Sequence, residues 1–284
     1  MASLAFVGHE LAFDVVLPGQ LPHSALELRT LHYFIFGHLC PKVKGTLFRY
    51  PRPMETFDLD QTAKLAALAP TPPQQRDQAW CDSVLHAAPN ASLASFNPQI
   101  QNGPDTFPYF QVAIPDAGPF TPFSIVHLLN HVLETGAGVV IHTNLRRDQQ
   151  PLWVFSFGDI LAYSLFQDFK GDPKVYSDKT PPNPNDRQVL RASPSESYLP
   201  SSARAAIGRF MRGPFRHPSP KIGLVTGASL QPRQSLMVNL RLKDYGGDQK
   251  KLDSAMRYLL WFIPKSYGLM ALPDAWPDTD MAPL

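Results

Sequence analysis

The sequence predicts an α+β protein built from two small domains, each a mixed β-sheet with helices packed on one face. Three observations predict this class. An amphipathic helix pattern at 121–136 is followed by two strand patterns, GVVIH at 138–142 and LWVFSF at 152–157. Between residues 221 and 272 the patterns run strand, strand, helix, strand. A segment rich in proline and serine separates these two regions.

Length and composition indicate where the domains begin and end. The chain has 284 residues, whereas single domains most often have roughly 100–150. Proline accounts for 30 residues, and it is dense between 171 and 200 together with Ser, Asp and Asn, as is typical of linkers. We therefore expect an N-terminal α+β domain at 1–175, a linker or long loop at 176–210, and a C-terminal α+β domain at 211–284.

The first expected element is a strand, AFDVVL at 12–17. Ser24 and Glu27 then form a capping box, in which each side chain satisfies a free amide of the first helical turn. Apolar residues follow at helical spacing as far as Leu39, which predicts a helix. A second strand is expected at 43–49.

Two helices and an extended segment come next. Asp58 is expected to cap one helix, and Thr71-Pro72-Pro73 is expected to open another that carries Trp80. Residues 106–114 have an extended pattern. Pro108 within it favours an edge strand or a bulge, because proline has no backbone N–H to donate to a neighbouring strand.

The clearest unit begins with a helix that Thr121 is expected to cap, with Pro122 at the first helical position. Its apolar face consists of Ile125, Leu128, Leu129, Val132 and Leu133. Gly136 supplies the C-terminal stop. The two strands after it are expected to pair through a polar hairpin tip at 143–151. A short helix is then expected at 160–166.

The C-terminal region predicts strands at 221–226, 235–242 and 267–272. In the second strand the side chains alternate, so that Leu236, Val238, Leu240 and Leu242 face away from Met237, Asn239 and Arg241. Asp248 is expected to cap an amphipathic helix between the second and third strands. The sequence closes with an acidic tail, PDAWPDTDMAPL, at 273–284.

This order of elements, KIGLVT, SLMVNLRLKDYGGDQKKLDSAMRYLLWFIP and YGLMALP, resembles the C-terminal domain of SseB-type ("enhanced serine sensitivity") bacterial proteins over about residues 215–284. The resemblance implies a bacterial, cytosolic, small α+β protein without established enzyme chemistry. It transfers no catalytic residue to this chain. A looser resemblance links such modules to bacterial toxin-immunity and adaptor proteins.

Composition narrows the function classes. The formal net charge is +2, and no cluster of five or more Lys and Arg residues occurs, so we expect no nucleic-acid partner. No run of about 18 uncharged apolar residues is present, so we expect no membrane span. The N-terminus lacks the basic region of a signal peptide, and the two cysteines do not form a C-x-x-C pair. These features favour a cytoplasmic protein.

The sequence HLLNH places His127 and His131 four residues apart, the spacing that zinc enzymes use on a helix. His142, on the following strand, would supply a third ligand. The zincin helix also carries a Glu directly after its first His, and Leu128 occupies that position here. We therefore expect both helix histidines to border the apolar face, and we keep a metal-dependent hydrolase that uses the three histidines as the alternative.

Other catalytic patterns are incomplete. Ser156 precedes a strand-to-helix turn, but Val154 stands where the first glycine of a nucleophile elbow is required. Cys81 and His86 share one expected helix, whereas a Cys–His dyad normally comes from separate elements, so Cys81 is expected in the core. We predict no catalytic residue and no cofactor.

The absence of catalytic patterns favours a non-enzymatic protein that binds a protein partner. We expect an immunity or adaptor protein for a secreted, type VI-like toxin; a structural or chaperone component of a secretion system is the other option. Interfaces need arginine and aromatic anchors in polar surroundings. The candidate partner-binding residues are Arg146, Arg147 and Asp148 at the hairpin tip and Asp274, Trp276, Asp278 and Asp280 in the tail. A solvated turn and a disordered terminus are the simpler interpretations.

Overall fold

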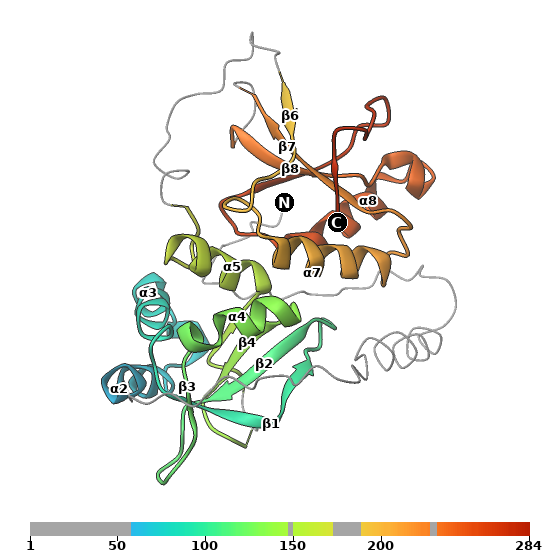
Figure 1. The fold of residues 1–284 in the computed structure, drawn as a ribbon. Helices are drawn as coiled ribbons and strands as arrows, with labels where there is room; N and C mark the ends of the chain where they lie inside the picture. Colours follow the sequence, from blue (N-terminus) through green and yellow to red (C-terminus); the bar gives the residue numbers. More distant parts are fainter. Residues whose placement is uncertain (1–57, 147–149, 173–188, 228–231) are drawn as a thin grey trace, which may run out of the picture.

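Two mixed β-sheets with helices between them make up the described part of the protein (Figure 1). The computed structural model describes residues 58–146, 150–172, 189–227 and 232–284. The predicted α+β class is confirmed. The strands and the helix expected between residues 12 and 49 lie outside the described residues.

The first sheet has the strand order β3-β1-β2-β4-β5. Its strands are β1 (Leu93–Asn102), β2 (Pro108–Ala113), β3 (Pro122–Phe123), β4 (Gly138–His142) and β5 (Trp153–Phe155). β2 and β4 pair in parallel, and the other neighbours are antiparallel. The predicted hairpin between β4 and β5 is confirmed.

Helices α2 (Leu59–Leu68), α3 (Gln78–Ala87), α4 (Ile125–Thr135) and α5 (Phe157–Phe166) and the short 3-10 helix η1 (Pro73–Gln75) accompany this sheet. Side-chain caps fix where all four α-helices begin: Asp58 accepts from Gln61 N, Asp77 from Trp80 N, Ser124 from His127 N and Ser156 from Asp159 N. Gly136 ends α4 in the left-handed region, at φ 75°, as predicted.

Three predictions in this half are wrong, and one strand was missed. Thr71-Pro72-Pro73 does not open the helix that carries Trp80, because α3 begins at Gln78, after the separate 3-10 helix η1. Thr121 and Pro122 do not open α4, because Pro122 lies in β3 and pairs with β1. β1 was not predicted; its register against β2 shifts between Ser95 and Ile100, which breaks the simple alternation. Pro108 does not mark an edge strand, since β2 lies between β1 and β4 and Pro108 is its first residue.

The second sheet has the order β10-β7-β8-β9, and β6 also pairs with β7. Its strands are β6 (Leu190–Ala192), β7 (Lys221–Thr226), β8 (Gln234–Val238), β9 (Gly268–Ala271) and β10 (Ala282–Pro283). Helices α7 (Ser201–Arg212) and α8 (Gln249–Leu260) and the 3-10 helix η2 (Leu242–Tyr245) belong to this half. Asp248 caps α8 as predicted, accepting from Lys250 N and Lys251 N.

The two sheets share one topological unit. In each, an antiparallel strand pair is followed by a helix and then by a strand parallel to the second member of the pair. The unit is β1-β2-α4-β4 in the first sheet, where β3 comes between β2 and α4, and β7-β8-α8-β9 in the second, where η2 comes between β8 and α8. A repeat is therefore present in the fold, although the sequence shows none by residue identity.

The predicted alternation along β8 is present, since Leu236 and Val238 belong to the large core and Met237 to a separate cluster, although the strand ends at Val238 and Leu242 lies in η2. Met237 is as buried as Leu236 on the opposite face, and Asn239 is buried as well. A small cluster of Val225, Met237, Leu272 and Met281 covers the second face of the sheet. β8 is buried on both sides because the C-terminal tail folds over it.

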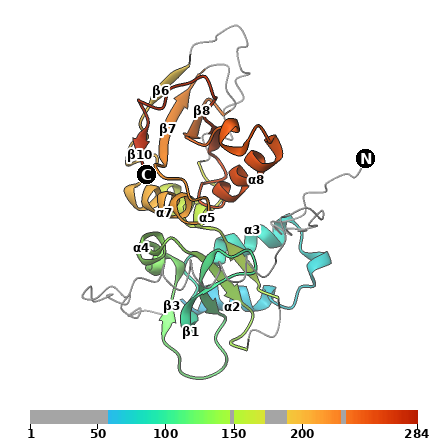
Figure 2. The same cartoon turned by 90° about the vertical axis from the view of Figure 1, so that its right-hand side faces the viewer.

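Helix α7 occupies residues that the sequence analysis assigned to a linker or long loop. Residues 173–188 lie outside the described residues, but β6 and α7 account for most of the rest of that segment. Ala203, Ala206 and Ile207 of α7 are buried. Figures 1 and 2 show α5 and α7 lying between the two sheets, with α4 on the neighbouring face of the first sheet.

One hydrophobic cluster runs through both halves. It contains Phe110 of the first sheet, Leu236 of the second and Ile207 of α7 between them. The aromatic rings of Phe107 and Trp261 stack at a centroid distance of 4.2 Å across the boundary. The division into two domains remains a prediction, because the described core is continuous.

Candidate functional site

A cleft between α3 and the C-terminal end of α5 is the candidate functional site. Its volume is about 260 Å³. It is lined by Asp82, Leu85, His86, Tyr163, Gln167, Asp168, Phe169 and Lys170. Five ionisable side chains therefore line the cleft together with the apolar side chains of Leu85 and Phe169.

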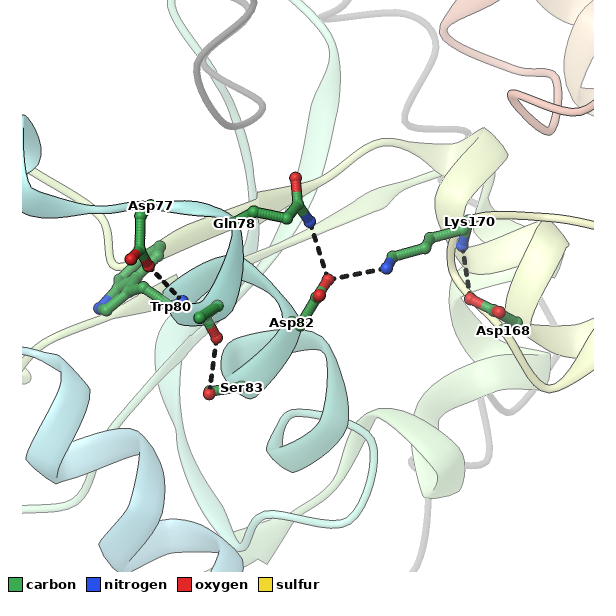
Figure 3. Close-up of polar contacts among 8 residues, drawn as sticks. Asp77, Gln78, Trp80, Asp82, Ser83, Asp168 and Lys170 are labelled. Carbon is green, nitrogen blue, oxygen red and sulfur yellow. Dashed lines mark hydrogen bonds and ion pairs between the residues drawn. The ribbon is translucent and has the colours of Figure 1, made fainter.

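Two of the lining residues, Asp82 and Lys170, form an ion pair (Figure 3). Lys170 Nζ lies 2.7 Å from Asp82 Oδ1, and each side chain is 48% exposed. Gln78 Nε2 donates to the same carboxylate oxygen at 2.8 Å. The backbone N–H of Lys170 donates to Asp168 Oδ1 at 2.8 Å, which holds the loop after α5 in place.

Local sequence explains why these groups converge. Asp77 caps α3, so Gln78 and Asp82 lie one turn apart on the same face of that helix. α5 ends at Gln167, which adopts a left-handed φ of 58° and turns the chain so that Lys170 reaches back to α3. Residues 88 positions apart in the sequence are thereby brought together.

The ion pair stabilises the ordinary charge of both partners. Hydrogen bonds from Lys170 and Gln78 lower the pKa of the Asp82 carboxyl, and the Asp82 contact raises the pKa of the Lys170 amine. A carboxylate with a lowered pKa is a poor general acid, and a protonated amine is no nucleophile. This pair is suited to binding charged groups.

The floor of the cleft is aromatic. Tyr163 stacks on Phe169 at 4.5 Å, and Phe169 stacks on Phe155 at 4.3 Å. Burial raises the pKa of the Tyr163 hydroxyl, and it also raises the pKa of the neighbouring Cys81 thiol. Both groups are therefore held neutral, so neither the phenol nor the thiol is activated for nucleophilic attack.

A second ion pair lies beside the cleft, between α5 and the loop before β9. Asp159 is buried, and its Oδ1 lies 2.8 Å from Lys265 Nζ. Its Oδ2 accepts from the N–H of Ser156, while the Ser156 hydroxyl accepts from Asp159 N, which completes a capping box at the start of α5. Ser156 therefore acts as a helix cap.

The three histidines of the alternative hypothesis do not form a metal site. Among the described residues, which include all three, no group of three or more His, Cys, Asp or Glu side chains could hold a metal ion. His142 Nε2 lies 2.6 Å from Gln111 Oε1, and the His131 ring packs edge-on against Phe110. His131 is half-buried at the border of the helix face, as predicted, whereas His127 is exposed.

The hairpin tip is described only in part. Arg146 is exposed, and its backbone N–H donates to Asn144 Oδ1 at 2.8 Å. Arg147 and Asp148 lie outside the described residues. The hairpin itself is confirmed, and a partner-binding role for its tip stays a prediction.

The acidic tail is ordered, and its side chains make contacts within the protein. Asp278 pairs with Lys221 at 3.2 Å and Asp280 with Arg191 at 3.0 Å. The Arg191 guanidinium also lies 5.3 Å from the centre of the Trp276 ring. Asp274 accepts from Lys243 N, at 3.4 Å. The interpretation of a disordered terminus is wrong, because the tail closes one face of the second sheet.

The prediction for Cys81 is confirmed, since this residue is 2% exposed within the core. Sequence reasoning did not find Asp82, Tyr163 or Lys170. No local spacing marks them, because each looks like an ordinary surface or helix residue until α3 and the end of α5 meet. The cap at Asp77 was the nearest available signal, because it fixes which face of α3 carries Asp82.

No protein-family model, no curated protein and no solved structure matches this chain. The resemblance to the SseB-type domain therefore stays a prediction. Within the described ranges, none of the helices is both long and apolar enough to span a bilayer.

Proposed function

We propose that this chain is a non-enzymatic protein that binds another protein, as a bacterial cytoplasmic immunity or adaptor protein for a secreted toxin. The observation that carries the proposal is the Asp82–Lys170 pair in the cleft. The shifts in its two pKa values favour fixed charges, and the neighbouring phenol and thiol are held neutral. Such a site recognises charged groups and has no activated nucleophile among these residues.

The size of the cleft favours a protein partner over a small metabolite. Pockets for small molecules usually enclose roughly 300–1,000 Å³ and bury most of the ligand. This cleft has about 260 Å³, and its charged pair is half exposed. It is suited to receiving one or two side chains that protrude from a partner surface, with Asp82 and Lys170 selecting the opposite charges.

Co-expression with the products of adjacent genes tests this function. We expect the protein to form a stable complex with one neighbouring toxin and to inhibit that toxin's activity. A structural or chaperone component of a secretion system would instead co-purify with machine subunits and leave the toxin active. If no neighbouring gene product forms a complex, the proposed function is wrong.

A charge reversal shows whether the cleft forms the interface. Lys170→Glu should weaken the complex by about tenfold or more, because it places a carboxylate beside Asp82. Lys250→Glu is the matched control, since it makes the same change of net charge on an exposed position of α8. If both variants bind the toxin as tightly as the parent protein does, the proposed function stands, but the cleft is not the interface.

A further inference from the structure

A second surface, remote in sequence from the cleft, combines aromatic rings with arginines. Phe210 near the end of α7, Phe215 in the turn after it and Tyr258 on α8 form its aromatic centre. Phe210 lies 5.0 Å from Phe215 and 6.5 Å from Tyr258 between ring centroids. Phe215 and Tyr258 are 6.4 Å apart. We call this group, with Arg212, Arg216 and Arg257, the arginine–aromatic surface.

The aromatic centre is both exposed and rigid. Tyr258 is 46% exposed, and the two phenylalanines are half-buried. Phe210 also packs on Phe262 at 5.0 Å and on Phe107 at 5.4 Å, which are buried core rings. Rings held in this way lose little conformational entropy when a partner covers them, so they are suitable anchors for binding.

Two exposed arginines adjoin these rings in the sequence: Arg216 follows Phe215, and Arg257 precedes Tyr258. Arg212, Arg216 and Arg257 are all exposed, and Arg212 Nη1 donates to the Leu284 carbonyl. Neither Arg216 nor Arg257 forms an ion pair with any residue that the structure describes. Arginine and aromatic residues are enriched at the hot spots of protein interfaces, where most of the binding free energy is concentrated.

The turn that presents Phe215 and Arg216 has an unfavourable backbone conformation. Arg216 adopts a left-handed φ of 51°, which costs free energy in a residue with a Cβ. The turn is held by hydrogen bonds from Arg216 N to the Gly213 carbonyl and from His217 N to the Met211 carbonyl. Conformations of this kind persist where the surrounding structure enforces them, often at binding sites.

We propose that the arginine–aromatic surface binds an acidic segment of a partner protein that carries a large apolar side chain. The arginines attract the carboxylates, and the apolar side chain packs on Phe215 and Tyr258. The acidic tail of this chain does not serve as that segment, because Asp278 and Asp280 are paired with Lys221 and Arg191. The surface is separate from the Asp82–Lys170 cleft, so a single chain could engage two partners.

A protein segment fits this surface better than a nucleic acid does. Single-stranded nucleic acids stack on aromatic faces along a positively charged groove. Here the rings meet one another edge-on or tilted, at 70° between Phe210 and Phe215, so their faces are partly covered. The formal net charge of the whole chain is +2. A second copy of the chain has the same arginines at this surface and would oppose its own docking there.

The test uses the full chain and a short synthetic peptide of Asp and Glu residues with one central Trp, labelled with fluorescein. Two further peptides replace the Trp with Ala or all acidic residues with Lys. We expect the acidic Trp peptide to bind tightest and its affinity to fall as salt rises. Arg216→Glu/Arg257→Glu should weaken binding by about tenfold or more. Lys250→Glu/Lys251→Glu, with the same change of net charge on α8, should have a much smaller effect.

Aromatic variants test the second half of the proposal. Tyr258→Ala should weaken binding of the Trp peptide more than that of the Ala peptide. Leu260→Ala is its control, since Leu260 is 49% exposed on the same helix. Thermal unfolding checks that each variant is folded, and Lys170→Glu should bind the peptide as the parent does. If the chain binds the peptide but forms no complex with a toxin, the proposed function is contradicted and the proposal for the arginine–aromatic surface is not.

Three outcomes would overturn the proposal for this surface. The first is equal weakening by the two double charge reversals. The second is tighter binding of a single-stranded oligonucleotide than of the acidic peptide. The third is self-association, seen by sedimentation, that Tyr258→Ala abolishes.

Discussion

The indole N–H of Trp261 donates a hydrogen bond of 3.0 Å to the hydroxyl of Tyr109, although 152 residues separate them. The Tyr109 hydroxyl in turn donates to Asp105 Oδ2 at 2.5 Å. Burial raises the pKa of both Asp105 and Tyr109. A buried polar chain thus joins the first sheet to the segment after α8, inside the aromatic contact between the two halves.

Tyr109→Phe removes the centre of this chain. The buried Trp261 N–H and the half-buried Asp105 carboxyl then lose their shared partner. We expect a loss of about 1–3 kcal/mol in the free energy of unfolding, measured by urea denaturation. Tyr163→Phe, at a half-buried hydroxyl in the cleft, should change stability by well under that amount. Equal losses of unfolding free energy in the two variants would contradict a stabilising role for the hydrogen bonds of Tyr109 with Trp261 and Asp105.

Gly158 marks a close backbone contact between the halves. Its N–H donates to the Trp261 carbonyl at 2.9 Å, and a Cβ there would lie 2.8 Å from Ile263 N and against the Ile263 carbonyl. Gly158→Ala should therefore destabilise the protein by more than about 2 kcal/mol, since backbone must move. At Gly223 a Cβ would find its nearest neighbour at 3.4 Å, so Gly223→Ala should be nearly neutral by thermal unfolding.

His131 predicts how stability depends on pH. Burial against Phe110 is the main cause that lowers the pKa of its ring, and the Glu134 charge opposes it. The unfolded chain then binds the proton more readily, so stability falls as pH drops below the unfolded value of about 6.5. His131→Gln should flatten this fall between pH 7 and pH 5. Asn130→Gln, which exchanges one non-titrating side chain for another at an exposed site on the same helix, should not flatten it.

Met281 tests whether the tail is part of the core. It packs with Val225, Met237 and Leu272, and it is 7% exposed. Met281→Ala should cost about 2–3 kcal/mol in a urea unfolding experiment. Thr279→Ala, at an exposed tail position, is expected to be neutral. A neutral Met281→Ala would indicate that the tail does not stabilise the second sheet.

Elements with both a periodic pattern and a clear end signal were predictable. Asp248 begins α8 and Gly136 ends α4 as expected, since capping depends on local hydrogen bonds. Prediction failed where a distant strand decided the outcome. Pro122 has a favourable local signal for a helix start, yet it pairs with β1 and so lies in the sheet.

The sites were harder to predict than the fold. HLLNH has the local spacing of a metal site. In the structure, however, His131 packs against Phe110, and His142 contacts the side chain of Gln111. The tail looked free because it is acidic and rich in proline, while its partners Lys221 and Arg191 lie on strands far earlier in the chain. Charge pairing between distant segments leaves no periodic pattern in the sequence.

The stacked contact between Phe107 and Trp261 has a consequence for how the protein is made. During synthesis Phe107, Tyr109 and Phe157 emerge from the ribosome long before Trp261 and Phe262 exist to cover them. Nascent chains with uncovered apolar surface are the ones that chaperones retain. Translation stalled shortly before residue 258 should therefore leave a chain that chaperones hold, and release should follow once α8 and the residues after it have been added.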